Sequence, residues 1–361
     1  MKPGLLFTSV HLGPYLSLGP LEHEFDLMQC LFLVEGPSLQ SRQQYMLPYW
    51  THDGVACAHG NLQGFLRDKD VRGILCGTSD GLPDGNLEDL VREAATECGV
   101  PVFVVEDFPG NYRACSRTRL DGLFVEHNSL EQGYQSCGVE ADRIHSLGNP
   151  RYDHLRFVER ACLRETTRAS LDLGDCSVIL WAGQPDGEKS FLTLERMLPS
   201  LMALETEMLF KAHPRDELYS AGAYKPLLSR LRAWRDVSSW IETRGLCCAA
   251  DLVLTQFSSV GVEASYLGTP ALFVLFDDLG MTYLRSRKGY DIVPWVSESC
   301  AFSLRSSDSI FERLETALFD DVRRSEIRRR FDDRYGLKPP SAPAIASIVN
   351  RCLSVSHQWG E

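Results

Sequence analysis

The sequence contains no apolar run close to the roughly 20 residues that a membrane-spanning helix requires, so we expect no membrane span. Its start, Met1-Lys2-Pro3-Gly4, leads directly into a predicted strand and does not resemble a signal peptide. The chain also lacks an excess of positive charge, because 49 acidic residues outnumber 37 basic ones and the net charge is −12. Neutralising nucleic-acid phosphates needs a basic surface, so this balance argues against nucleic acid as a partner. It does not exclude a local basic pocket.

No cysteine spacing indicates a zinc site, although the chain has 12 cysteines. Cys247 and Cys248 are adjacent and cannot form a C-x-x-C knuckle, and most of the others lie scattered in apolar segments. We therefore expect reduced thiols in a cytoplasmic protein and no structural metal. Internal repeats, low-complexity tracts, a Gly-x-Ser-x-Gly elbow and a nucleophile–His–acid triad are missing too.

The order of the predicted elements indicates an α/β protein. The strand Val71–Thr78, the helix Asn86–Cys98 and the strand Pro101–Val105 form a strand–helix–strand unit, which requires a parallel sheet with a right-handed crossover. A chain of 361 residues exceeds one ordinary core, so we predict two Rossmann-like domains.

The segment Gly148-Asn149-Pro150 is typical of a linker, because a glycine and a proline flank a polar residue. It places the boundary near Asn149. We therefore predict an N-terminal domain over residues 1–149, a C-terminal domain over 150–340, and a last helix over 341–361 that crosses back onto the first domain.

Three further local predictions depend on shorter patterns. We expect a strand over Gly54–Ala58, one helix over His154–Leu171, and another helix over Leu192–Glu207.

The stretch from residue 251 to 276 carries the clearest functional signal. It predicts a strand over Asp251–Thr255, a helix over Val260–Tyr266 and a strand over Pro270–Phe276. Ser258 and Ser259 stand where that helix begins, and the free N–H groups and positive dipole end of a helix start favour an anion. The same position also suits Ser258 as an ordinary N-cap.

We predict that this helix start binds a nucleoside diphosphate. The residues expected to contact the diphosphate are Ser258, Ser259, Val260 and Gly261. Glu263 follows one helical turn later, within reach of the ribose of the same nucleotide.

His213 is a second candidate for the same ligand. It follows the predicted strand Met208–Ala212 and precedes Pro214. An imidazolium there would stabilise a leaving phosphate, and a neutral imidazole could relay a proton. The alternative is a loop histidine paired with Asp216. The predicted binding set is completed by Gly183, Gln184 and Arg215, which also lie in loops that follow predicted strands.

Three motifs of this half, namely residues 245–276, Lys211-Ala212-His213-Pro214 and residues 148–153, resemble the nucleotide-binding half of GT-B glycosyltransferases. They are similar to UDP-N-acetylglucosamine 2-epimerases and to the glycerophosphotransferases and capsule transferases that use CDP-activated donors. The resemblance implies two domains that face each other across a deep cleft, with the nucleotide bound mainly to the second.

The first half is similar to the epimerases in its Gly77-Thr78-Ser79-Asp80 loop and in the strand before Glu106. It departs from them directly afterwards, because residues 107–111 read Asp-Phe-Pro-Gly-Asn where the epimerases have Ala-Gly-Leu-Arg. This departure argues against epimerase chemistry.

The resemblance implies a bacterial, cytoplasmic transferase that moves a sugar from a nucleotide-diphosphate donor to a small-molecule or glycan acceptor. No convincing D-x-D pair is present, and protein groups can absorb the charge of a leaving diphosphate, so we expect neither a metal nor a cofactor. We expect the general base in the first domain, where Glu106, Asp107 and His11 are the candidates.

Two other functions stay open. One is a 2-epimerase or hydrolase that acts on a UDP-sugar, and the other is a scaffold of this fold without catalysis. The oligomeric state also stays open, with a homodimer as one alternative.

Overall fold

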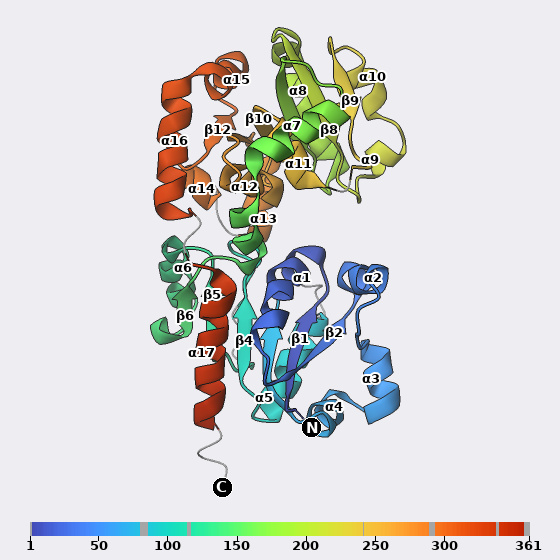
Figure 1. Ribbon diagram of the computed structural model, residues 1–361, viewed down its shortest axis with the longest axis vertical. Coiled ribbons are helices and arrows are strands. Elements are labelled where there is room, and N and C mark those ends of the chain that lie inside the picture. The colour runs from blue at the N-terminus through green and yellow to red at the C-terminus, as the bar shows by residue number, and fades with distance from the viewer. Residues whose placement is uncertain are drawn as a thin grey trace. The chain divides into compact units, whose positions relative to one another are not determined.

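The computed structural model of the protein describes residues 2–79, 86–113, 117–240, 242–288, 293–336 and 339–356. The chain divides into two compact units (Figure 1). Unit 1 consists of Met1–Asp153 and Leu337–Glu361, and unit 2 consists of His154–Gly336. Among the described residues, no helix combines the length and apolarity needed to cross a bilayer.

Unit 1 is a six-stranded parallel sheet in the order β2-β1-β3-β4-β5-β6. Its strands are β1 (Gly4–Ser9), β2 (Gln29–Val34), β3 (Val71–Cys76), β4 (Val102–Val105), β5 (Gly122–Val125) and β6 (Ile144–Ser146). Its α-helices are α1 (Leu12–Leu18), α2 (Gly36–Gln44), α3 (His52–His59), α4 (Leu62–Asp68), α5 (Leu87–Glu97), α6 (Glu131–Ser136) and α17 (Ser341–Ser356).

Both faces of this sheet are covered, because successive side chains of each strand point to opposite sides. In β1, Leu6 belongs to a buried cluster on the side of α3, α4, α5 and α6, whereas Leu5 and Phe7 belong to a second cluster with α1 and α17. The carboxylate of Asp153 accepts hydrogen bonds from the backbone N–H groups of Ser341 and Ala342, both at 2.8 Å. Asp153 therefore caps α17, a helix nearly 190 residues further along the chain.

Unit 2 repeats this architecture in the order β12-β11-β10-β7-β8-β9. All of these strands pair in parallel. They are β7 (Ser177–Ala182), β8 (Thr206–Lys211), β9 (Trp234–Asp236), β10 (Leu252–Thr255), β11 (Ala271–Leu275) and β12 (Phe302–Arg305).

The helices of unit 2 lie on both faces of its sheet. They are α7 (Arg160–Ser170), α8 (Gly187–Met202), α9 (Glu217–Ser220), α10 (Tyr224–Leu228), α11 (Thr243–Ala249), α12 (Ser259–Tyr266), α13 (Gly280–Lys288), α14 (Pro294–Ser297), α15 (Ile310–Phe319) and α16 (Asp321–Arg334). One buried cluster joins α8, α10 and α15 to the sheet, while α12 contacts β10 and β11. The predicted α/β class with parallel Rossmann-like sheets is confirmed.

Three local predictions are wrong. The segment predicted as the strand Gly54–Ala58 lies in α3, because the hydroxyl of Thr51 accepts from the N–H of Gly54 and starts a helix there. The helix expected from His154 begins only at Arg160, after a 3₁₀ turn. The helix expected over Leu192–Glu207 is α8, which starts earlier because Asp186 caps it and ends before β8.

Candidate functional site

The predicted donor residues of unit 2 gather at one edge of its sheet. β7 lies between β10 and β8, and its last residue, Ala182, pairs with Thr255 and Lys211, the last residues of those strands. The carboxyl ends of parallel strands share one edge, so the loops that follow them are neighbours. The N–H of Gly183 donates to the carbonyl of Lys211 at 2.9 Å. A Cβ on Gly183 would lie 3.2 Å from the backbone nitrogen of His213, so these two loops touch.

The hydroxyl of Thr255 ties three of these segments together. It donates to the carbonyl of Ala182 at 2.9 Å and accepts from the side-chain amide of Gln184 at 2.9 Å. It also accepts from the backbone N–H of Ser258 at 3.2 Å. A threonine hydroxyl has one hydrogen and two lone pairs, so its bonding capacity is used completely. Gln184 is buried and holds the loop after β7 in place.

Ser258 is the N-cap of α12, as one of the two sequence interpretations held. Its backbone is extended, and its side chain accepts from the N–H of Val260 at 3.2 Å. The N–H of Gly261 is also engaged, since it donates to the carbonyl of Ser258 at 3.0 Å. The N–H groups predicted to bind an anion at positions 260 and 261 are thus already bonded within the helix start.

Ser259 provides the hydrogen-bonding groups at this helix start that are not engaged by other described residues. It is half-buried, and among the described residues neither its hydroxyl nor its N–H has a hydrogen-bond partner. The hydroxyl hydrogen of Ser258 also stays available, because that oxygen acts as an acceptor within the cap. Glu263 lies one turn further along α12 and is half-buried. Gly261 has a packing role, since a Cβ there would lie 2.9 Å from Cζ of Phe273.

His213 is held as a neutral imidazole. Its Nδ1 accepts from the N–H of Arg215 at 3.1 Å, which leaves the proton on Nε2. Burial, together with the charge of Arg215, lowers the pKa of His213 to about 4. The carboxylate of Asp216 accepts hydrogen bonds from the N–H of Tyr219 at 3.0 Å and the hydroxyl of Tyr224 at 2.8 Å. At neutral pH, His213 therefore presents an N–H donor and not a cation, and Arg215 is exposed beside it.

Two residues of this edge were missed as site residues. One is Thr255, and the other is Lys211, whose ammonium donates to the carbonyls of Trp240 at 2.6 Å and Ser238 at 3.5 Å. Burial lowers the pKa of Lys211. The available signal was a polar residue at the end of each apolar strand, where side chains reach the ligand edge.

The predicted acid–base residues of unit 1 also lie at the carboxyl edge of a sheet. One oxygen of Asp107 accepts from the hydroxyl of Thr78 at 2.7 Å and from the side-chain amide of Asn111 at 2.8 Å. Its other oxygen lies against Gly13, in the first turn of α1 and two residues after His11. The structure therefore brings Asp107 and the segment of His11 together. Asp80, part of the motif shared with epimerases, lies outside the described residues.

A second carboxyl group, that of Glu88, is linked to the backbone of His11 through Ser79. The N–H of His11 donates to the hydroxyl of Ser79 at 3.0 Å, and that hydroxyl donates to Glu88 at 2.8 Å. Burial raises the pKa of Glu88 to about 7. Glu88 is not among the predicted site residues, because an acidic residue in the first turn of a helix is ordinarily a partner of the helix dipole.

Glu106 is buried, and its hydrogen bonds stabilise the loop that follows β4. One of its oxygens accepts from the N–H groups of Asn111 at 3.1 Å and Tyr112 at 3.3 Å, and from the hydroxyl of Tyr134. The other oxygen is buried without a partner. Burial raises the pKa of Glu106 to about 8, so the carboxyl group is protonated at neutral pH. This geometry favours a positioning role, because only 2% of the residue is exposed.

Metal-ligand geometry is not seen in the described part of the chain. Within residues 2–79, 86–113, 117–240, 242–288, 293–336 and 339–356, no three or more His, Cys, Asp or Glu side chains are placed to hold a metal ion.

Solved structures with this fold are two-domain GT-B proteins. The Neisseria meningitidis UDP-GlcNAc 2-epimerase bound to UDP-GlcNAc has a TM-score of 0.65 and 13% identity, over 98% of this chain and 100% of that one. Staphylococcus aureus MnaA in its complex with UDP has a TM-score of 0.70 and 13% identity, over 98% and 97%. The wall teichoic acid polymerase TagF has a TM-score of 0.58 and 13% identity, over 98% and 89%. At these identities the likeness establishes the fold.

The family is established by the sequence. Residues 117–337, more than half of the chain, match the model of CDP-glycerol:poly(glycerophosphate) glycerophosphotransferases. The chain belongs to this family of transferases. A search of curated proteins finds no match.

Replacing Thr255 tests whether its hydroxyl supports the edge. Thr255→Val keeps the shape but leaves the donors of Gln184 and Ser258 unpaired in a buried place, so the free energy of unfolding should fall by about 2–4 kcal/mol. Thr255→Ser keeps the hydroxyl, removes one methyl group and should cost about 1 kcal/mol. Urea denaturation measures both, and equal losses would contradict the assigned role.

Glu106 should make stability depend on pH. Its folded pKa of about 8 lies above the roughly 4.3 of an unfolded glutamate, so the folded state binds more protons between these values. Its contribution to stability is present below about pH 4 and is lost as the pH rises towards 8. Glu106→Gln is neutral throughout. Relative to the parent, this variant should therefore gain up to about 1.4 kcal/mol of unfolding free energy per pH unit between pH 5 and 7. Denaturant titrations at several pH values measure the difference, and a constant difference would show that Glu106 is ionised.

Proposed function

We propose that this protein transfers a phosphorylated polyol of the glycerophosphate type from a CDP-linked donor to a hydroxyl acceptor. The observation that carries the proposal is the family match over residues 117–337, which spans all of unit 2's candidate donor residues. The geometry supports it, since hydrogen-bond donors that suit a phosphate gather where β7, β8 and β10 end.

The reaction is a substitution at phosphorus. The acceptor oxygen forms a bond to the phosphorus that carries the polyol, and the bond from this phosphorus to the bridging oxygen breaks. CMP leaves with the electron pair of that bond, and the acceptor proton passes to a base. The principal demand on the protein is to stabilise the charge that develops on CMP.

Unit 2 can meet this demand with its own groups. Ser259 supplies a hydroxyl and an N–H at the positive end of α12, and His213 supplies an Nε2–H donor. These donors are fixed before the reaction. Thr255 and the N-cap Ser258 hold the start of α12, and the N–H of Arg215 holds the ring of His213. We therefore propose that transfer proceeds without a metal ion.

For the base we propose Asp107 or His11 in place of Glu106. A base must reach the acceptor proton and be unprotonated, and Glu106 is buried, bonded on one oxygen and protonated at neutral pH. Asp107 is half-buried and lies beside the segment of His11.

The released nucleotide distinguishes this proposal from glycosyl transfer. Substitution at phosphorus releases CMP, whereas glycosyl transfer breaks a bond to a sugar carbon and releases a nucleoside diphosphate. We expect CDP-glycerol with an oligomeric glycerol-phosphate acceptor to yield CMP, at an equal rate in the presence of EDTA. Anion-exchange chromatography separates the nucleotides. Release of CDP, or of UDP from a UDP-sugar, would support glycosyl transfer, and release without acceptor would indicate a hydrolase.

A matched pair of variants links this activity to α12. Ser258→Ala/Ser259→Ala should weaken donor binding about 10- to 100-fold, the value of one charge-assisted hydrogen bond or slightly more. Ser309→Ala removes the N-cap of α15 in the same unit and should leave donor affinity unchanged. Equal donor affinity in all three proteins would contradict the placement of the phosphate.

A further inference from the structure

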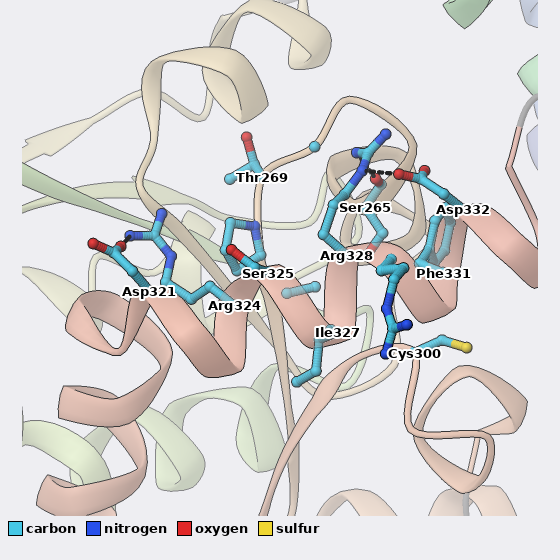
Figure 2. Close-up of a pocket in the computed structure, with 14 residues that line it drawn as sticks. Ser265, Thr269, Cys300, Asp321, Arg324, Ser325, Ile327, Arg328, Phe331 and Asp332 are labelled. Atoms are coloured by element: carbon cyan, nitrogen blue, oxygen red, sulfur yellow. Dashed lines mark hydrogen bonds and ion pairs between the residues drawn. The ribbon is translucent and has the colours of Figure 1, made fainter.

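A second pocket in unit 2 lies away from the candidate donor edge. Its volume is about 540 Å³, within the range of small-molecule sites. The wall on one side is the end of α12 and the start of β11, with Ser265, Thr269 and Pro270, and the wall on the other side is α16 (Figure 2). Because the pocket adjoins the amino end of β11, it lies at the sheet edge opposite to Ser259.

Guanidinium groups dominate the polar lining. Arg324 and Arg328 are four residues apart on α16, and Figure 2 shows them extending from the same side of that helix. Arg329 belongs to the same lining. Arg160 of α7 joins them at Gly268, where a Cβ would lie 2.7 Å from Nη1 of Arg328 and 3.2 Å from Nη1 of Arg160.

Two carboxylates only partly neutralise these four cations. Asp332 accepts from Nε of Arg328 at 2.6 Å, and Asp321, whose side chain is 91% exposed, is 3.4 Å from Arg324. The described residues place no carboxylate against Arg160 or Arg329. Burial lowers the pKa of Arg160, and the neighbouring arginines lower it further, as expected where positive charges lie close together. A chain of net charge −12 thus has a local cationic pocket.

Several donors in the pocket are free to bind a ligand. Arg328 uses Nη1 to bind the carbonyl of Ser265 at 2.9 Å, and Arg324 uses Nη1 to bind the carbonyl of Leu318 at 2.9 Å. Their Nη2 groups have no partner among the described residues, and the same is true of the whole guanidinium of Arg329. The guanidinium of Arg329 can therefore offer two parallel N–H groups to the oxygens of a phosphate, and the Nη2 groups of Arg324 and Arg328 can add single hydrogen bonds.

We propose that this pocket binds a small organic phosphate, at a site separate from that of the CDP-linked donor. Arg324, Arg328 and Arg329 hold the phosphate group. The apolar side chains of Ile327 and Pro270, both half-buried in the lining, contact the organic part. The volume of the pocket favours an organic phosphate over the free ion, because the arginines leave room beside the apolar wall.

Calorimetry on the full chain tests this site with inorganic phosphate and phenyl phosphate at constant ionic strength. We expect phenyl phosphate to bind several-fold more tightly, because its ring adds apolar contact. Arg324→Gln/Arg329→Gln should weaken its binding at least tenfold. The control Arg323→Gln removes an exposed arginine of the same helix that pairs with Glu326 at 2.9 Å, and it should change affinity less than twofold.

Two further variants keep the test decisive. Asp332→Asn releases Arg328 from its carboxylate and should strengthen phenyl phosphate binding several-fold, even if the double arginine variant does not fold. Ser258→Ala/Ser259→Ala should leave this binding unchanged. The proposal would be overturned by equal affinity for the two probes, or by an equal loss of affinity in the Arg323 control. It would also be overturned by unchanged or weaker binding in the Asp332 variant, or by a loss of affinity confined to the serine variant.

Discussion

One buried hydroxyl group, that of Thr255, holds the candidate donor edge of unit 2 together. It accepts from Gln184 and Ser258 and donates to Ala182, so it joins the ends of two strands to the first turn of α12. The close approach of α12 to the sheet depends on Gly261, where a side chain would meet Phe273. The positive end of that helix is therefore fixed in advance, so binding at the proposed phosphate site need not order it.

The two carboxyl edges differ in their chemistry. In unit 2 the groups at this edge are hydrogen-bond donors, namely the N–H and hydroxyl of Ser259, Nε2 of His213 and the exposed guanidinium of Arg215. In unit 1 the edge carries carboxyl groups, and burial raises the pKa of Glu88 to about 7 and that of Glu106 to about 8. In general, hydrogen-bond donors suit a phosphate, and an ionised carboxylate suits a proton.

Regular apolar segments made the fold predictable from the sequence. The elements around Ser258 were expected within one residue of their observed bounds, because buried parallel strands leave continuous apolar runs. The error at α3 arose because a short segment with mixed polarity has no clear period, and the cap formed by Thr51 decides its structure. No strand was predicted at β12, because it has only four residues and lies at the edge of the sheet beside β11, so its own pattern was too short to detect.

The candidate site was predictable in its residue types but not in its hydrogen bonding. Polar residues after apolar strands predicted that His213 and Ser259 lie at one edge of the sheet, and the structure places both there. The sequence could not show that Val260's N–H is already bonded, or that the N–H of Arg215 selects the tautomer of His213. The hydrogen bond from Tyr134 to Glu106 joins residues that are 28 positions apart in the sequence. Glu106 was predicted as a base, and this contact gives it a role in positioning the loop instead.

Nuclear magnetic resonance of the deuterated, ¹⁵N-labelled protein during titration with CDP tests the central claim most directly. We expect the largest backbone amide shifts at Gly183, His213 and Ser259. Shifts confined to unit 1 or to α16, or no shifts at high CDP concentration, would contradict the placement of the donor at the edge formed by β7, β8 and β10.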